Sequence, residues 1–132
     1  MSGRILNIGS INIDYVYRVP HFVQPGETLA SQSFASGLGG KGANQSVAIA
    51  SAGGLVTHLG KVGSADTWAI EQLSQAGVDT SLIETSNGAS GHAIIQVNDQ
   101  GENAIVLHAG ANHELDLTRL RAALTANRDA KL

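Results

Sequence analysis

Glycine dominates one short stretch of the chain and constrains the backbone there. Four glycines fall within six positions of the run Gly37-Leu38-Gly39-Gly40-Lys41-Gly42-Ala43-Asn44. Glycine permits positive φ angles and lets the backbone approach a ligand closely. The apolar run Val47-Ala48-Ile49-Ala50 follows at once. This order predicts a loop leading into the N-terminus of a buried helix, where free N–H groups favour anionic or strongly polar oxygens.

The two common phosphate-binding patterns fit this run poorly. The pattern GxxxxGK[ST] needs Ser or Thr after a Gly-Lys pair, whereas Lys41 is followed by Gly42. Gly37, Gly39 and Gly42 meet the GxGxxG spacing, but no clear strand leads directly into them. One interpretation is therefore a plain glycine turn before a buried helix. Lys41 and Asn44 favour the other, a loop that binds a ligand.

Composition narrows the class of protein. A chain of 132 residues with 42% hydrophobic content can form one domain, or part of one, with a moderate core. The net charge of −3, with eight scattered Lys and Arg residues, argues against a nucleic-acid partner. Absence of cysteine excludes disulfides and thiolate metal sites, and the five histidines lack metal-binding spacing. No apolar run approaches the roughly 18 residues of a membrane span, so we expect a cytoplasmic protein without a membrane partner.

Residues 11–19 alternate strictly and predict a strand with two different faces. One face carries the apolar and aromatic side chains Ile11, Ile13, Tyr15, Tyr17 and Val19. The other carries Asn12 and Asp14, which lie two positions apart and therefore point the same way. An amide beside a carboxylate suits a ligand with vicinal hydroxyls. A solvated sheet face is the alternative interpretation.

The rest of the chain alternates between strand and helix patterns. Strands are expected over residues 4–9, 28–36, 55–60, 78–84, 91–97 and 103–108. Helices are expected after the glycine run, between Asp66 and Gly77, which lies just past the end of that helix, and after Asp116, with an aspartate capping each of the last two. This order predicts the start of a parallel sheet, and residues 98–102 predict a hairpin. No strand pattern follows the last helix, which is unusual for such a sheet, so we expect an unfinished domain.

Four motifs, in the right order, resemble the ribokinase and phosphofructokinase-B sugar-kinase family. They are Gly9-Ser10-Ile11-Asn12-Ile13-Asp14, Pro25-Gly26-Glu27-Thr28, Gly39-Gly40-Lys41-Gly42-Ala43-Asn44-Gln45, and Gly101-Glu102-Asn103 followed by His108-Ala109-Gly110-Ala111-Asn112. The resemblance covers essentially the whole chain but only the N-terminal portion of the family's fold. It implies a ribokinase-like α/β fold, with residues 1–132 forming its sugar-binding part and a small β lid from about residues 12–36 and 91–108.

The resemblance also implies roles for particular residues. Sugar-binding residues by this comparison are Asn12, Asp14, Gly39, Gly40, Lys41 and Asn44. Apolar lid contacts over the sugar are Ala93, Ile95 and Leu107. The family's catalytic base stands in a Gly-Ala-Gly-Asp type motif that these residues lack, so no catalytic residue and no metal ligand is expected in this chain.

The implied activity is ATP-dependent phosphorylation of D-ribose or a related sugar at its primary hydroxyl. ATP, Mg²⁺ and a monovalent cation such as K⁺ are the cofactors that the family implies, with their sites in a C-terminal part missing here. The chain alone is therefore expected to be inactive, and a homodimer through the lid is expected. The alternative is a truncated, non-catalytic module for sugar binding or dimerisation.

Overall fold

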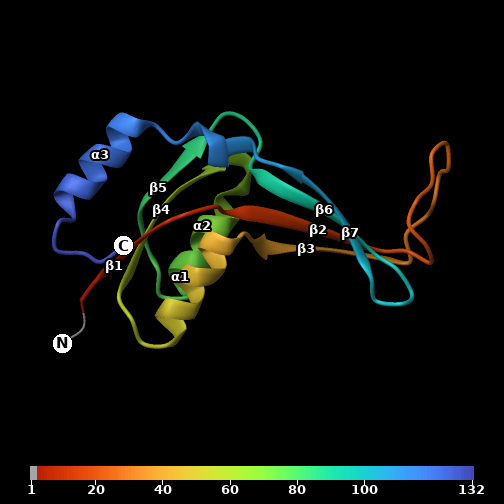
Figure 1. Cartoon of the computed structure of the whole chain (residues 1–132), viewed down its shortest axis with the longest axis horizontal. Coiled ribbons are helices and arrows are strands. Elements are labelled where there is room, and N and C mark those ends of the chain that lie inside the picture. The colour runs from red at the N-terminus through yellow and green to blue at the C-terminus, as the bar shows by residue number, and fades with distance from the viewer. Residues whose placement is uncertain (1–2) are drawn as a thin grey trace.

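The computed structural model describes residues 3–132 and contains two sheets, one extending from the other (Figure 1). The first has the order β1-β4-β5 and is parallel throughout. Its strands are β1 (Ile5–Ile8), β4 (Val56–Gly63) and β5 (Asp79–Ser86). The expected parallel sheet is confirmed.

The second sheet has the order β3-β2-β6-β7 and is called the lid here. Its strands are β2 (Asn12–Arg18), β3 (Ser33–Gly39), β6 (Gly91–Val97) and β7 (Asn103–His108). β2 pairs in parallel with β6, whereas β2–β3 and β6–β7 are antiparallel. The expected hairpin is therefore present as β6–β7.

Helices cover both faces of the parallel sheet. Helix α1 (Lys41–Ser51) and helix α2 (Thr67–Gln75) pack on one face, where Ala43, Ala69 and Leu73 share a buried cluster with Val56 and Val62. Helix α3 (Leu117–Ala126) packs on the other face through a second cluster. That cluster contains Leu6, Leu59, Ala123, Leu120 and Leu124. Two short 3-10 helices, η1 (Ser64–Asp66) and η2 (Gly110–Glu114), connect the layers.

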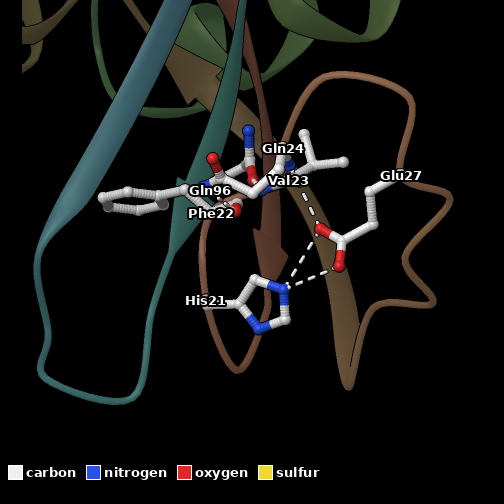
Figure 2. Close-up of polar contacts among 6 residues, drawn as sticks. All are labelled: His21, Phe22, Val23, Gln24, Glu27 and Gln96. Atoms are coloured by element: carbon white, nitrogen blue, oxygen red, sulfur yellow. Dashed lines mark hydrogen bonds and ion pairs between the residues drawn. The ribbon is translucent and has the colours of Figure 1, made fainter.

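A long loop of residues 19–32 forms the tip of the lid and is tied together by polar contacts (Figure 2). His21 Nε2 and Glu27 Oε2 lie 2.9 Å apart. Glu27 Oε1 also accepts from the backbone N–H of Gln24 at 3.1 Å. Gln96 on β6 accepts from the backbone N–H of Val23 at 2.9 Å through its Oε1, which joins the loop to the lid.

The strand predicted over residues 28–36 is misplaced, because β3 begins at Ser33 and continues to Gly39. A strand needs a partner, and β2 ends at Arg18, which pairs with Ser33. Residues 28–32 therefore have no strand beside them, whereas Gly39 pairs with Asn12. The prediction that no strand leads into the glycine run was also wrong, because pairing with β2 extends β3 as far as Gly39.

Most of the predicted glycine loop is thus strand or helix. Within it only Gly40 has a positive φ, of 93°, and it joins β3 to α1. The fully buried positions of α1 are Gly42, Ala43 and Ser46, rather than the later apolar run. The helix begins inside the motif because the first turn packs against the end of β1.

Two aspartates predicted to cap helices behave differently. The Asp116 side chain accepts from the N–H of Thr118 at 2.9 Å and caps α3 as expected. Asp66 occupies the N-cap position of α2, but its side chain makes no cap hydrogen bond. It accepts instead from Ser90 Oγ at 2.6 Å and from Trp68 Nε1 at 3.3 Å. A nearby hydroxyl therefore replaces the helix N–H as its partner.

After α3 the chain returns to the free edge of β1. Lys131 forms a single parallel bridge with Ile5. The N–H of Leu6 donates to the Lys131 carbonyl at 2.7 Å, and the N–H of Lys131 donates to the Arg4 carbonyl at 2.9 Å. As expected, no strand follows α3 in the described residues, although this isolated bridge places Lys131 beside the edge of β1.

Candidate functional site

A cavity of about 580 Å³ lies between the lid and the N-terminus of α1. The residues predicted to form a sugar site lie along its wall, apart from Gly39: Asn12, Asp14, Gly40, Lys41, Asn44, Ala93, Ile95 and Leu107. The structure thus brings together side chains from β2, α1, β6 and β7. Their role in binding a ligand stays a prediction.

Asn12 and Asp14 lie on the cavity side of β2, as the alternation predicted. Gly39 on β3 is buried and lies beside Asn12, and a Cβ at that position would overlap the Asp14 carboxylate. Gly39 therefore makes room for the carboxylate and is not itself part of the cavity wall. Burial raises the pKa of the Asp14 carboxyl above its usual value.

The start of α1 forms a second polar edge of the cavity. A Cβ on Gly40 would lie 2.8 Å from the Ser10 carbonyl oxygen and 2.9 Å from the Asn12 nitrogen, so this junction needs glycine. The N–H of Ala43 donates to the Ser10 carbonyl at 2.9 Å. These contacts fix the first turn, from which Lys41 and Asn44 reach the cavity with exposed side chains.

The apolar part of the wall continues from Asp14 across the same face of the lid, on β6 and β7. Asp14 is level with Ala93, which is level with Leu107. One step further out, Ile95 is level with Ile105. Ala93 is buried, whereas Ile105 and Leu107 are 50% and 69% exposed. The site thus combines a carboxylate, two amides and an amine with a hydrophobic surface.

Several cavity residues were not predicted as site residues. They are Ser10, Ile105, His108, Ala109, Asn112 and His113. Ile105 shares a face with Leu107 in the alternation of β7, so that pattern could have found it. Asn112 belongs to one of the motifs that carry the family resemblance, but the motif alone assigned it no role. Its contacts are visible only once η2 and β2 are side by side.

Beneath the first turn of α1, a chain of hydrogen bonds joins this helix to β1 and β4 of the parallel sheet. Asn7 Nδ2 donates to the Gly42 carbonyl and to Ser46 Oγ, both at 2.9 Å. Ser46 Oγ lies 2.7 Å from His58 Nδ1, and His58 Nε2 lies 3.0 Å from the Gly9 carbonyl oxygen. Burial lowers the pKa of His58, which keeps the ring neutral. This network holds the base of the polar edge in place.

Between residues 3 and 132, no group of three or more His, Cys, Asp or Glu side chains is placed to hold a metal ion. None of the helices described there is long and apolar enough to cross a membrane.

Comparison with known proteins decides the family. The sequence model described as "pfkB family carbohydrate kinase" matches residues 2–132. The chain belongs to the pfkB family of carbohydrate kinases. A ribokinase of Haemophilus influenzae is 45% identical over 82% of this chain. The chain spans only 36% of that relative's length.

Solved structures of pfkB-family relatives share the fold. A ribokinase from Giardia lamblia superimposes with a TM-score of 0.86 at 30% identity, over 98% of this chain and 43% of its own. A ribokinase of Arabidopsis thaliana, complexed with ribose and ATP, gives a TM-score of 0.76 at 27% identity, over 85% of this chain and 38% of its own. The ribokinase-like α/β fold is confirmed. The chain corresponds to about two fifths of these pfkB relatives.

Proposed function

We propose that this chain is the sugar-binding part of a ribokinase-like carbohydrate kinase and takes D-ribose or a related furanose. The observation that carries the proposal is the cavity that Asn12, Asp14, Lys41 and Asn44 line together with the apolar residues of β6 and β7. The Arabidopsis relative that was solved with ribose shares this fold.

The chemistry of the cavity suits a polyol. A carboxylate accepts hydrogen bonds from hydroxyls, whereas the ammonium group of Lys41 donates to them, and amides can do both. A polar group left without its hydroxyl in such a site costs about 1–3 kcal/mol, so the site selects against sugars that lack one. The carbon face of the sugar would lie against Ala93, Ile95 and Leu107.

In the proposed reaction, a general base takes the proton of the sugar's primary hydroxyl, and the oxygen attacks the γ-phosphoryl group of ATP. Residues 3–132 contain no group of three or more His, Cys, Asp or Glu side chains placed to hold Mg²⁺. We assign the base and the sites for ATP, Mg²⁺ and K⁺ to the part of the longer relatives that this chain does not match. This chain would hold and orient the acceptor sugar, and we expect it to transfer no phosphate alone.

Titration calorimetry with D-ribose tests the sugar site. Weak binding is expected, because a site closed on one side leaves part of the ligand in water. Asp14→Asn should abolish the binding, since it removes the carboxylate charge with little change of shape. Asp99→Asn makes the same chemical change at an exposed turn and should leave binding intact. Equal binding by wild type and Asp14→Asn would refute the assignment.

Phosphoryl transfer needs a separate assay. The chain is incubated with ATP, Mg²⁺, K⁺ and D-ribose, and sugar phosphate is measured by mass spectrometry. No product above a mock preparation is expected. Product that is lost in Asp14→Asn would show that the whole reaction occurs within this chain.

We also propose that the lid pairs with the lid of a second copy. Its outer strand β7 exposes Val106, which is 68% exposed and points to the other face of the sheet from the cavity residue Leu107. Phe34 on β3 is 55% exposed. Small sheets with uncovered apolar faces are marginal in water, and a second copy would cover them. Sedimentation at tens of micromolar should show a dimer that Val106→Glu dissociates. A monomer in wild type would refute it.

A further inference from the structure

We propose that Asn112 is a positioning residue that turns the Asn12 side-chain amide, so that Asn12 presents its Nδ2 donor to the cavity. The proposal rests on the proposed sugar site for the identity of the ligand. It assigns a role to a residue that lies 100 positions from its partner.

The orientation of Asn112 follows from a backbone group. The N–H of Ile11 donates to Asn112 Oδ1 at 3.0 Å. A backbone N–H can only donate, so the Asn112 atom facing Ile11 must be the oxygen. The amide nitrogen of Asn112 therefore points the other way. There it lies 2.7 Å from Asn12 Oδ1.

The orientation of Asn12 follows in turn. The Nδ2 group of Asn112 can only donate, so the Asn12 atom that it contacts must be the acceptor, Oδ1. This leaves Asn12 Nδ2, which makes no hydrogen bond among residues 3–132, as the group available at the cavity. Next to it, Asp14 is an acceptor. A ligand thus meets a donor and an acceptor in a fixed order along β2.

The position of Asn112 is itself well fixed. Its neighbour Ala111 is fully buried and donates its N–H to the Ala89 carbonyl at 2.9 Å. The N–H of Asn112 donates to the Ala109 carbonyl at 3.1 Å. Gly91 leaves the space in which the two amides meet, because a Cβ there would overlap Asn112 Nδ2 and lie 2.7 Å from Asn12 Oδ1. The contact is therefore built from β2, β6 and η2 together.

The fixed order has a consequence for specificity. A free asparagine amide can rotate and present either atom, so it would accept a hydroxyl in either role. An amide held by Asn112 presents only a donor, so the oxygen of the ligand must accept at that point. Asn112 acts on the ligand through Asn12, which predicts that the two residues are energetically coupled.

NMR tests the contact without any ligand. In the labelled chain, scalar couplings across hydrogen bonds should join Ile11 N to Asn112 Cγ, and Asn112 Nδ2 to Asn12 Cγ. In Asn112→Asp the first coupling should persist, because a carboxylate also accepts. The second should be replaced by one from Asn12 Nδ2 to the Cγ of the introduced carboxylate, since the amide must turn to donate. An unchanged Asn12 amide in this variant would overturn the proposed orientation.

A double-mutant cycle tests the effect on binding. Asn112→Ala should weaken D-ribose binding about tenfold in the wild-type background, within the range of couplings between contacting residues. It should have almost no effect in an Asn12→Ala background. Asn87→Ala, the same change at an exposed position, is the matched control. Equal losses in both backgrounds would show that Asn112 acts on the fold and not through Asn12.

The NMR and binding experiments distinguish failure of the proposed function from failure of the positioning role. If wild type does not bind D-ribose, the proposed function fails, and the scalar couplings still decide whether Asn112 sets the Asn12 amide. If ribose binds but the couplings are absent, the positioning role fails alone. Gly91→Ala gives a further check, because its methyl group would overlap Asn112 Nδ2 and should abolish the second coupling. The methyl group would also lie 2.7 Å from the Ala109 carbonyl oxygen, so backbone amide spectra must first show that the variant keeps the fold.

Discussion

Ser46 Oγ and His58 Nδ1 lie 2.7 Å apart in the buried layer between α1 and β4. His58 is fully buried, and its other ring nitrogen faces the Gly9 carbonyl oxygen. A carbonyl can only accept, so Nε2 carries the proton and Nδ1 accepts from the Ser46 hydroxyl. The ring joins the end of β1 to the helix that carries Lys41. A single neutral tautomer is thus built into the base of the site.

Stability is expected to depend on pH through His58. Burial lowers the pKa of this ring in the folded state, so between that pKa and the unfolded value of about 6.5 the unfolded chain binds more protons. The free energy of unfolding should therefore be highest above pH 6.5 and fall as the pH drops through this window. Urea unfolding at pH 7.5 and 5.5 measures the loss.

His58→Gln separates this contribution from that of the other four histidines. The variant should be less stable by about 1–3 kcal/mol at pH 7.5, because it disturbs a buried hydrogen-bonded pair. The difference in the free energy of unfolding between wild type and variant should be smaller at pH 5.5. Wild type loses stability there as His58 takes up a proton, whereas glutamine does not titrate. A disadvantage that stays constant with pH would contradict the buried neutral ring.

Sugar binding is expected to depend on pH through Asp14. Burial raises the pKa of this carboxyl, and hydroxyl donors bind the ionised form better. D-Ribose affinity should be constant near neutral pH and fall as the pH drops through a midpoint above 3.8. Calorimetry from pH 7.5 downward measures this midpoint. A midpoint at or below the ordinary value would contradict the burial of the carboxylate.

The raised pKa of Asp14 makes stability depend on pH in the opposite direction from sugar affinity. Between the ordinary and the raised pKa of Asp14, the folded state binds more protons than the unfolded state. Its contribution to stability is therefore largest at low pH and declines as the pH rises through this window. Asp14→Asn should then be more stable than wild type at pH 7 while losing the sugar. Chemical denaturation of the two proteins, compared at one pH, measures the difference.

Local patterns predicted the part of the site that lies within one strand. Alternation alone placed Asn12 and Asp14 on one face, because side chains in a strand repeat with a period of two. The contact of Asn12 with Asn112 depends on tertiary packing across 100 positions, which no local pattern contains. The same limit applies to β3, whose bounds follow from pairing with β2 and not from its own composition.

The two aspartates at helix starts show why one residue type gives different outcomes. Both are typical N-cap residues by sequence, but Ser90, which lies 24 positions from Asp66, offers that side chain a hydroxyl at 2.6 Å. Asp116 has no such competitor among the described hydrogen bonds and caps the helix as predicted. The N-cap preference of aspartate decides whether it caps a helix only where no residue distant in sequence competes for its side chain.

Removal of the Asp116 cap should have a small, defined cost. Asp116→Ala deletes the acceptor for the Thr118 N–H and should destabilise the chain by about 1 kcal/mol. Asp116→Asn keeps an oxygen at the same place and should recover most of the loss. Urea unfolding compares the three proteins. Equal stability of the alanine and asparagine variants would show that charge, and not the cap hydrogen bond, is responsible.

Three glycines of the motif at residues 37–42 should respond differently to alanine. A Cβ at Gly37 meets nothing within 4 Å, so Gly37→Ala should leave both stability and D-ribose affinity unchanged. The three atoms nearest to a Cβ at Gly39 all belong to the side chain of Asp14, which can rotate away. Gly39→Ala should therefore keep the fold and lose most of the sugar affinity.

Gly42 is the contrasting position. A Cβ there would lie 2.5 Å from the Gly9 carbonyl carbon and 2.6 Å from the Ser10 nitrogen, and backbone atoms cannot rotate away as a side chain can. Gly42→Ala should force α1 away from β1 and destabilise the fold by about 1–3 kcal/mol, as overpacked positions do. Thermal unfolding and D-ribose titration of the three variants measure the two effects separately. Loss of stability in Gly39→Ala without loss of D-ribose affinity would contradict the placement of Asp14. Such a result would mean that the backbone moves to make room for the new methyl group and that the Asp14 side chain stays in place.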